Sequence, residues 1–113
     1  MRRVFVDTSA FFAHLDAEDA HHTEAHALFL RADTESWTLI TTDAVVCKTY
    51  TLLRMRAHNG GKLALDFLED IQDGLCDVER VRPLDEVRAI ELLRRYVDKK
   101  YSFCDARSFV VTE

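Results

Sequence analysis

The feature that most constrains this chain is a short, largely apolar run that stops at a carboxylate. Residues 3–6 form the run, and a helical pattern over residues 10–15 follows almost directly. Asp7, Thr8 and Ser9 stand between them. A strand buried on both faces is typical of the centre of a parallel sheet, and open α/β sheets gather functional residues at the carboxyl ends of their strands. All three polar residues are also good helix N-caps, so a structural interpretation stays open.

A second carboxylate lies near the other end of the chain. Asp105 falls in the first turn of a predicted helix, with Ser102 as the expected N-cap. The helix dipole alone stabilises an acid in a first turn by about 0.3–1 kcal/mol, so this position has a structural explanation as well. Two acids at the ends of elements nevertheless suggest a shared pocket for Asp7 and Asp105. The residues expected to face the core from this last helix are Phe103, Ala106, Phe109 and Val110.

Hydrophobic periodicity predicts alternating strands and helices along the whole chain. The predicted order is a strand, two helices, a strand over residues 37–40, two helices, a strand over residues 76–81, a helix after Pro83, and a final junction of a strand with a helix. Thr41 or Thr42 is the expected cap of the helix after the second strand. This alternation indicates an α/β domain with a central parallel sheet and helices on both sides. The side chains expected to face the core after Pro83 are Val87, Ile90, Leu93 and Val97.

Length and composition indicate one domain. A chain of 113 residues with 48% hydrophobic content can bury one core but not two, and no linker divides it. No run approaches the roughly 20 apolar residues of a membrane span, and the start lacks the apolar stretch of a signal peptide, so a cytoplasmic protein without a membrane contact is expected. Three scattered cysteines, Cys47, Cys76 and Cys104, fit a reducing compartment and are expected in or near the core.

Four segments, in order, resemble the PIN domain and, within it, the VapC-type toxins of bacterial and archaeal toxin–antitoxin pairs. The segments are residues 4–13, 19–32, 41–54 and 101–105. Each motif is short, so their order and spacing carry the resemblance. It covers essentially the whole chain, residues 1–113, as a single PIN-like domain.

The resemblance implies an endoribonuclease that hydrolyses RNA phosphodiester bonds with Mg²⁺ or Mn²⁺. In the family three or four carboxylates converge at the C-terminal edge of the sheet, and the metal generates a hydroxide and stabilises charge on the scissile phosphate. Asp7 matches the family's first acid and Asp105 its third, which makes both candidate catalytic residues and metal ligands. The secondary site candidates are Thr8, Ser9, Asp43 and Ser102. The implied partners are an RNA substrate and a cognate antitoxin.

One position departs from the family pattern at the site itself. Alignment of residues 45–49 with the family's second acid places Lys48 where a Glu is expected. A cation about 4 Å from a carboxylate interacts with it by about 4 kcal/mol at an effective dielectric near 20. We therefore expect the Lys48 ammonium to lie within salt-bridge reach of Asp7 or Asp105, while it offers no lone pair to Mg²⁺. Such a site binds a divalent ion poorly or not at all, and the chain is expected to be inactive or attenuated. The alternatives are that the alignment is shifted by one residue or that Lys48 points to solvent, as helix lysines usually do.

The end of the chain is the second departure. The sequence stops inside an apolar helical pattern with no Gly or Asn C-cap. The family continues with a further strand that carries a fourth Asp, so we expect a C-terminally incomplete domain whose last strand is missing. A bare sheet edge and the apolar residues Phe103, Phe109 and Val110 are then expected to support a homodimer or a segment-exchanged oligomer.

Two other classes of function stay open. The chain can be a non-catalytic PIN-fold module for interaction or dimerisation, or a small doubly wound α/β binding domain of the receiver or flavodoxin type. No Gly-rich phosphate loop follows the first strand, which counts against nucleotide binding. The histidines His21, His22 and His26 include a pair at metal-ligand spacing, but an exposed helix start explains them equally well.

A basic rim for an RNA backbone is a weaker possibility. Its residues are Arg54, Arg56, Lys62, Arg94, Arg95, Lys99 and Lys100. The net charge of −5 argues against broad affinity for nucleic acid, so any such surface has to be local.

Overall fold

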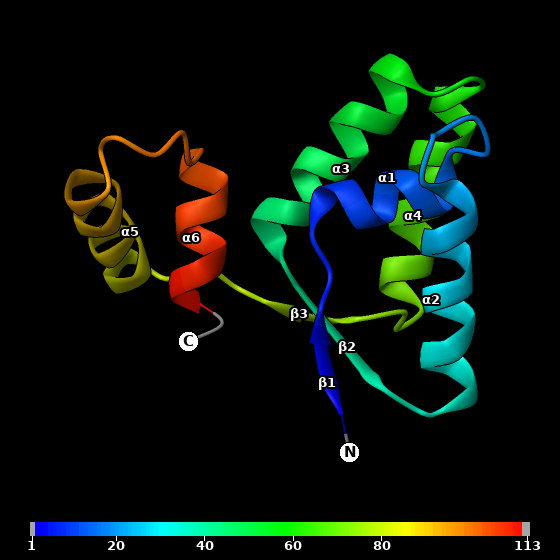
Figure 1. Ribbon diagram of the computed structural model, residues 1–113, viewed down its shortest axis with the longest axis horizontal. Coiled ribbons are helices and arrows are strands. Elements are labelled where there is room, and N and C mark those ends of the chain that lie inside the picture. The colour runs from blue at the N-terminus through cyan, green and yellow to red at the C-terminus, as the bar shows by residue number, and fades with distance from the viewer. Residues whose placement is uncertain (1, 112–113) are drawn as a thin grey trace.

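The computed structural model describes residues 2–111, without the side chains of Cys104 and Ser108. Strands and helices alternate along the chain as predicted (Figure 1). The elements are β1 (Arg3–Phe5), α1 (Thr8–Leu15), α2 (His22–Thr34), β2 (Thr38–Thr42), α3 (Asp43–Arg56), α4 (Gly60–Gln72), β3 (Asp77–Glu79), α5 (Pro83–Arg95) and α6 (Phe103–Val111). Among the described residues, no helix is both long and apolar enough to cross a membrane.

The sheet is parallel throughout, with the strand order β1-β2-β3. Arg3 lies opposite Thr38, and Ile40 lies opposite both Phe5 and Asp77. The prediction that the first strand is central and buried on both faces is wrong for the described sheet. β2 is its central strand, whereas β1 is an edge strand whose Arg3 and Phe5 side chains are exposed. A receiver-like or flavodoxin-like sheet has β1 between β2 and β3, so this order excludes that alternative.

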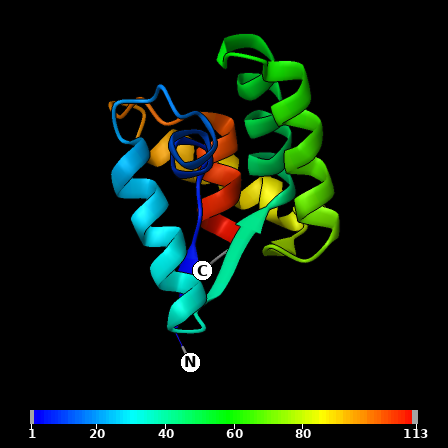
Figure 2. The ribbon, with the colours of Figure 1, turned by 90° about the vertical axis from the view of Figure 1, so that its right-hand side faces the viewer.

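Helices cover the sheet from both sides, which confirms the predicted α/β architecture. In Figure 1, α5 and α6 lie to the left of the strands, whereas α1, α2 and α4 lie to the right. Figure 2 shows α1 end-on between α2 and the pair formed by α3 and α4. α6 also contacts α3 and β2. The last helix is therefore held against the start of α3, which matters for the site below.

No strand precedes α6 in the described chain, contrary to the predicted junction. Residues 96–102 form a turn and a loop in which the Lys99 amide donates to the Tyr96 carbonyl at 2.9 Å. This segment contains Asp98, Lys99 and Lys100, whose charged side chains disfavour a buried strand. The predicted missing strand belongs beyond residue 111, outside the described residues.

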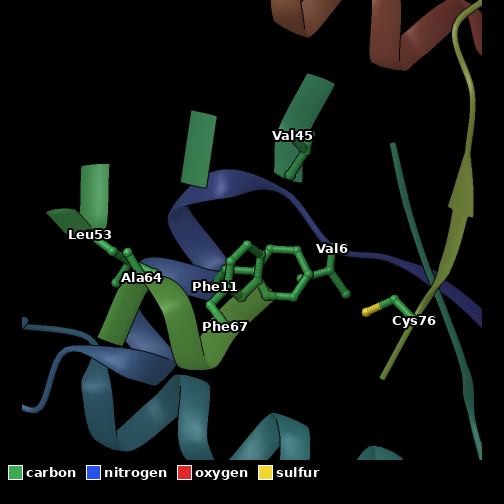
Figure 3. Packing of buried hydrophobic residues seen from close by; sticks show 7 residues of the cluster. All are labelled: Val6, Phe11, Val45, Leu53, Ala64, Phe67 and Cys76. Atoms are coloured by element: carbon green, nitrogen blue, oxygen red, sulfur yellow. The ribbon is translucent and has the colours of Figure 1, made fainter. Parts of the chain in front are cut away.

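The main core lies between α1, α3, α4 and the sheet (Figure 3). Its buried members are Val6, Phe11, Val45, Leu53, Ala64, Phe67 and Cys76. Burial raises the pKa of the Cys76 thiol to about 12, so this thiol stays neutral. Cys47, in contrast, is exposed on α3, so its predicted place in or near the core is wrong, and the Cys104 side chain is outside the described residues.

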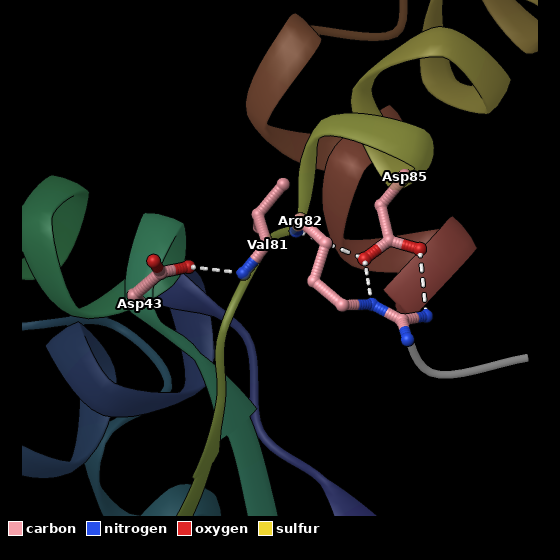
Figure 4. A network of polar contacts seen from close by, with 4 residues as sticks. All are labelled: Asp43, Val81, Arg82 and Asp85. Atoms are coloured by element: carbon pink, nitrogen blue, oxygen red, sulfur yellow. Dashed lines mark hydrogen bonds and ion pairs between the residues drawn. The ribbon is translucent and has the colours of Figure 1, made fainter.

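The inward face of α5 differs from the predicted one. Val87 and Ile90 are 53% and 46% exposed, and Val97, which lies beyond the end of α5, is 82% exposed, while Asp85 and Ala89 are buried. Of the four predicted residues only Leu93 packs against the core, where it is partly buried. The first turn of α5 determines which of its side chains face inward. There the Arg82 backbone N–H and guanidinium both donate to the Asp85 carboxylate (Figure 4). This capping interaction and the packing of Ala89 against α6 outweigh the apolar stripe.

The apolar face of α6 is divided between a small core and solvent. Ala106 and Val110 are buried against Ala89, as predicted. Phe103 and Phe109 are 43% and 44% exposed, so the prediction that they face the core is wrong. Small side chains let α5 and α6 approach closely, and the rings lie outside this contact.

Two adjacent glycines at the start of α4 provide a matched test of packing. A Cβ at Gly60 would lie 2.1 Å from the Leu53 carbonyl oxygen, whereas a Cβ at Gly61 would meet nothing within 4 Å. We expect Gly60→Ala to lower the free energy of unfolding by about 1–3 kcal/mol or more, because backbone must move. Gly61→Ala should raise it by about 0.4–1 kcal/mol. Urea denaturation measures both, and equal midpoints would contradict the close contact of α3 with α4.

Candidate active site

An open cleft of about 470 Å³ lies at the carboxyl end of β1, between α1, α3 and α6. Its lining residues are Phe5, Asp7, Thr8, Ser9, Val45, Lys48, Leu52, Tyr101, Asp105 and Phe109. The fold thus brings Asp7 and Asp105, from opposite ends of the chain, into one cleft, as predicted. Lys48 lines the same cleft.

Asp7 is the N-cap of α1, and it is exposed to solvent. Its Oδ1 atom accepts hydrogen bonds from the Ala10 amide and from the Ser9 hydroxyl, both at 3.0 Å. Asp7 is therefore a helix cap, as the structural interpretation proposed, but capping occupies only one of its carboxylate oxygens. The Oδ2 atom accepts no hydrogen bond from any described residue. Ser9 orients Asp7, and Thr8, which is buried, forms part of the cleft wall.

Asp105 is held in the same way at the start of α6. The Ser102 hydroxyl accepts from the Asp105 amide at 3.0 Å, and Asp105 Oδ2 accepts from the Ser102 amide at 3.1 Å. This reciprocal capping box confirms Ser102 as the N-cap, although Ser102 does not line the cleft. Oδ1 of Asp105 remains without a hydrogen bond from the described chain. Each acid thus keeps one oxygen for a ligand.

Lys48 does not form the predicted salt bridge. Its side chain is exposed, and in residues 2–111 no ion pair within 4.0 Å joins it to Asp7 or Asp105. Both carboxylates already accept hydrogen bonds at their own helix starts. An exposed ammonium also gains little from an ion pair, since pairing costs it hydration and side-chain freedom. Lys48 therefore lines the cleft as a cation exposed to solvent, in line with the alternative interpretation.

Asp43 is not part of this cleft. It lines a neighbouring hollow, and its Oδ1 atom accepts from the Val81 amide at 3.3 Å and from the Ala44 amide at 2.9 Å (Figure 4). Asp43 thereby ties the start of α3 to the segment that leads from β3 into α5. The structure does not bring this secondary candidate together with Asp7 and Asp105.

The cleft residues are a poor fit for a catalytic divalent ion. Within the described chain, no group of three or more His, Cys, Asp or Glu residues is placed to hold a metal. Mg²⁺ needs only one or two carboxylates when water and phosphate complete its shell, and Asp7 and Asp105 could supply these. Lys48, however, adds a positive charge to the same cleft and no lone pair. The donors have the right chemistry, but Lys48 cancels part of the negative charge that would attract a cation, and it supplies no ligand.

The histidines of α2 pack against α1. His22 and His26 stack with ring centroids 5.9 Å apart, and the His14 ring lies 5.5 Å from His26 and 4.1 Å from Phe29. His22 Nδ1 also donates to the Ala13 carbonyl at 2.9 Å, which fixes its tautomer. These contacts favour a structural role for the histidines over a role as metal ligands. Among the described residues, no group of three ligands that includes them is placed to hold a metal.

Stability is expected to depend on pH through His14. Burial lowers its pKa from the ordinary value of 6.5, His26 and His22 lower it further, and Asp70 acts in the opposite direction. Folded chains therefore bind this proton less readily than unfolded ones. The stabilisation is complete above pH 6.5 and is lost as the pH falls through the lowered pKa. The free energy of unfolding, measured by urea denaturation at pH 7 and at pH 5, should fall less for His14→Phe than for the unaltered chain when the pH is lowered. An unchanged loss, equal to that of the exposed-site control His58→Gln, would contradict this.

Sequence reasoning missed several residues around the site. Tyr101 and Phe109 line the cleft and contact each other edge to face, with ring centroids 5.6 Å apart. Arg80 and Arg107 line the adjacent hollow together with Lys48. Arg80 directly follows β3, so the rule that selected Asp7, the carboxyl end of a parallel strand, could have selected it as well.

Comparison with known proteins places this geometry in a family, although no protein-family model matches the chain. Two curated proteins named 23S rRNA-specific endonuclease VapC20, from the CDC 1551 and H37Rv strains of Mycobacterium tuberculosis, are 33% identical to it over 108 residues. The match covers 96% of this chain and 79% of each relative. The crystal structure of Mycobacterium tuberculosis VapC20, described as a Sarcin-Ricin loop cleaving toxin, superposes with a TM-score of 0.86 at 34% identity and covers 96% of this chain and 80% of that one. The chain therefore belongs to the VapC-type toxins of the PIN-domain family.

Proposed function

We propose that this protein is a VapC-type toxin that binds RNA in the cleft of Asp7 and Asp105, with an endoribonuclease activity attenuated by Lys48. The observation that carries the proposal is the presence of Lys48 in the same cleft as both acids. RNA is the proposed substrate class, because the curated relatives are named 23S rRNA-specific endonucleases. Relatives of this type imply a divalent-metal requirement, with Mg²⁺ or Mn²⁺ as the proposed ion, and Lys48 makes this cleft a weak site for it.

The residues of this chain have separate proposed roles in the cleft. The Asp7 and Asp105 oxygens without a described partner can accept hydrogen bonds from a water molecule beside the RNA phosphate. The Lys48 ammonium can donate to a non-bridging phosphate oxygen. A single ammonium replaces little of the charge stabilisation that a family site provides, and loss of one such group costs about 10²–10³ in rate. Binding is thus kept while chemistry is slowed.

The experiment is cleavage of a labelled fragment of ribosomal RNA by the full chain with Mn²⁺, with VapC20 as the reference enzyme. We expect this chain to be slower by about 10²–10³-fold, with the residual cleavage lost in Asp7→Asn and in Asp105→Asn. Cleavage that survives both substitutions would show that the site lies elsewhere. Turnover as fast as that of VapC20 would show that Lys48 does not attenuate the enzyme.

A cognate antitoxin and a second copy of the chain are the proposed protein partners. The cytoplasm is the proposed location, because a ribosomal RNA substrate would be found there. Three aromatic side chains support a protein contact, because Tyr101, Phe103 and Phe109 are each more than 40% exposed. Val110, predicted to share this contact, is buried and is not available for it. Sedimentation velocity should show concentration-dependent association to a homodimer or a segment-exchanged oligomer. A chain that stays monomeric at high micromolar concentration would contradict that state.

A non-catalytic interaction module is the second candidate. It is favoured by the same observation, since a cleft with two acids and a lysine lacks the family's second acid. The cleavage experiment separates the two functions, because an interaction module has no residual activity for Asp7→Asn to remove.

A further inference from the structure

Lys48 lines two hollows. On one side lies the cleft of Asp7 and Asp105. On the other side lies a hollow of about 390 Å³ lined by Asp43, Ala44, Cys47, Lys48, Arg80 and Arg107. We call this second space the basic hollow. Its walls come from the start of α3, the residue after β3, and α6, three segments that are distant in sequence.

The charge of the basic hollow is positive. Three cations face one carboxylate in its lining, and Asp43 already accepts hydrogen bonds from two backbone amides. Lys48 and Arg80 are exposed and form no ion pair with any described residue. The N-terminus of α3 adds the positive end of its helix dipole. This local positive charge stands out in a chain whose net charge is −5.

Arg107 is held in place on the wall of the basic hollow. Its guanidinium lies over the Phe103 ring at 5.3 Å and pairs with Glu86 at 3.4 Å. Glu86 therefore offsets part of this one charge, but not those of Lys48 and Arg80. The buried Nε atom of Arg107 has no acceptor within the described chain. A planar guanidinium fixed by stacking is well suited to binding phosphate, because less side-chain freedom is lost when it binds.

We propose that the basic hollow is a phosphate subsite, in which Lys48, Arg80 and Arg107 hold a backbone phosphate of an RNA strand without a divalent ion. The inference rests on the proposed function for its ligand, because RNA is the polyanion that a VapC-type cleft is expected to receive. Lys48 then contributes to RNA binding. It replaces a metal ligand in the cleft and contributes a cation to the subsite beside it, so the strand stays bound where cleavage is slow.

Fluorescence anisotropy of a labelled RNA hairpin with the full chain in EDTA tests the subsite. We expect salt-dependent binding. Arg80→Ala and Lys48→Ala should each weaken it several-fold and lower the slope of log Kd against log salt by about one, since each loses one phosphate contact. Arg80→Lys should retain binding. Arg88→Ala, an exposed position on α5 outside both hollows, is the matched control and should bind like the unaltered chain.

Three results would overturn the inference. One is no RNA binding in EDTA, and another is Arg80→Ala and Lys48→Ala binding as tightly as Arg88→Ala. Inorganic phosphate is the second probe, and displacement of the RNA at micromolar phosphate would identify a site for the free anion instead of a strand.

Asp7→Asn keeps the two proposals distinguishable. This variant is expected to lose cleavage but to bind RNA in EDTA at least as tightly, because it removes a negative charge near the strand. If it keeps cleavage while Arg80→Ala loses RNA, the proposed function fails and the subsite stands. If it loses cleavage while Arg80→Ala binds normally, only the subsite fails.

Discussion

Replacement of Lys48 by Glu is expected to raise the rate of metal-dependent RNA cleavage by about 10²–10³-fold. The substitution changes the charge of the cleft by two units and adds a third carboxylate beside Asp7 and Asp105. Three carboxylates can hold Mn²⁺ or Mg²⁺ at a substrate phosphate, which generates the nucleophile and stabilises the developing charge. Initial rates on one RNA fragment, with and without EDTA, measure the change.

Two controls separate charge from coordination. Lys48→Gln removes the cation without adding a carboxylate, so its gain should be small compared with that of Lys48→Glu. The double variant Asp7→Asn/Lys48→Glu should return to the low rate, because it lacks the first acid. If Lys48→Glu cleaves no faster than the unaltered chain, position 48 is not the attenuated position, and the alignment behind the proposal is wrong.

Truncation of Phe67 to Ala is expected to lower the free energy of unfolding by about 3–5 kcal/mol. Phe67 is 1% exposed, and its ring meets that of Phe11 edge to face at 5.1 Å, which joins α4 to α1. Removal of the ring loses buried apolar area and leaves a cavity between two helices. Denaturation in guanidinium chloride gives the change.

Leu65→Ala is the matched control on the same helix. Leu65 is 55% exposed, so its truncation should change the free energy of unfolding by no more than about 0.5 kcal/mol. Equal losses for the two variants would show that the cluster of Figure 3 is not the main source of stability. Neither side chain lines the cleft, so RNA binding by the folded fraction should be unchanged.

The sequence was most informative where local chemistry decides the structure. Thr42 caps α3, Ser102 caps α6 and Asp7 caps α1, each within the predictions. Each of these positions depends on hydrogen bonds within a few residues. The rule that functional residues gather at the carboxyl ends of parallel strands selected Asp7. It does not explain Asp105, because no described strand precedes α6, and only the packing of α6 brings this acid into the cleft.

The errors occurred where tertiary contacts decide. Val87 and Ile90 fit a helical pattern, yet the Arg82–Asp85 cap and the packing of Ala89 against α6 turn them outward. Val97 lies beyond the end of α5. Small residues such as Ala89 carry a weak hydrophobic signal, so the periodicity favoured the larger side chains. The first strand was predicted to be central because its residues are largely apolar. Composition alone does not determine which strands flank a given strand, and β1 is in fact at the edge of the described sheet.

The sequence could not predict which residues surround Lys48. Alignment placed it at the site, but its distance from the acids depends on how α3 and α6 pack. The basic hollow joins positions 48, 80 and 107, which no sequence periodicity connects. It depends on the fold, which brings the residue after β3 and one residue of α6 to the start of α3.

Lys48 is expected to make this cleft a poor site for a divalent ion, and titration of the full chain with Mn²⁺ by isothermal calorimetry measures this directly. The unaltered chain should show no saturable binding in the cleft. Lys48→Glu should gain one site, which the further change Asp7→Asn removes. The account would be contradicted if the unaltered chain bound Mn²⁺ as tightly as Lys48→Glu and lost that binding with Asp7→Asn.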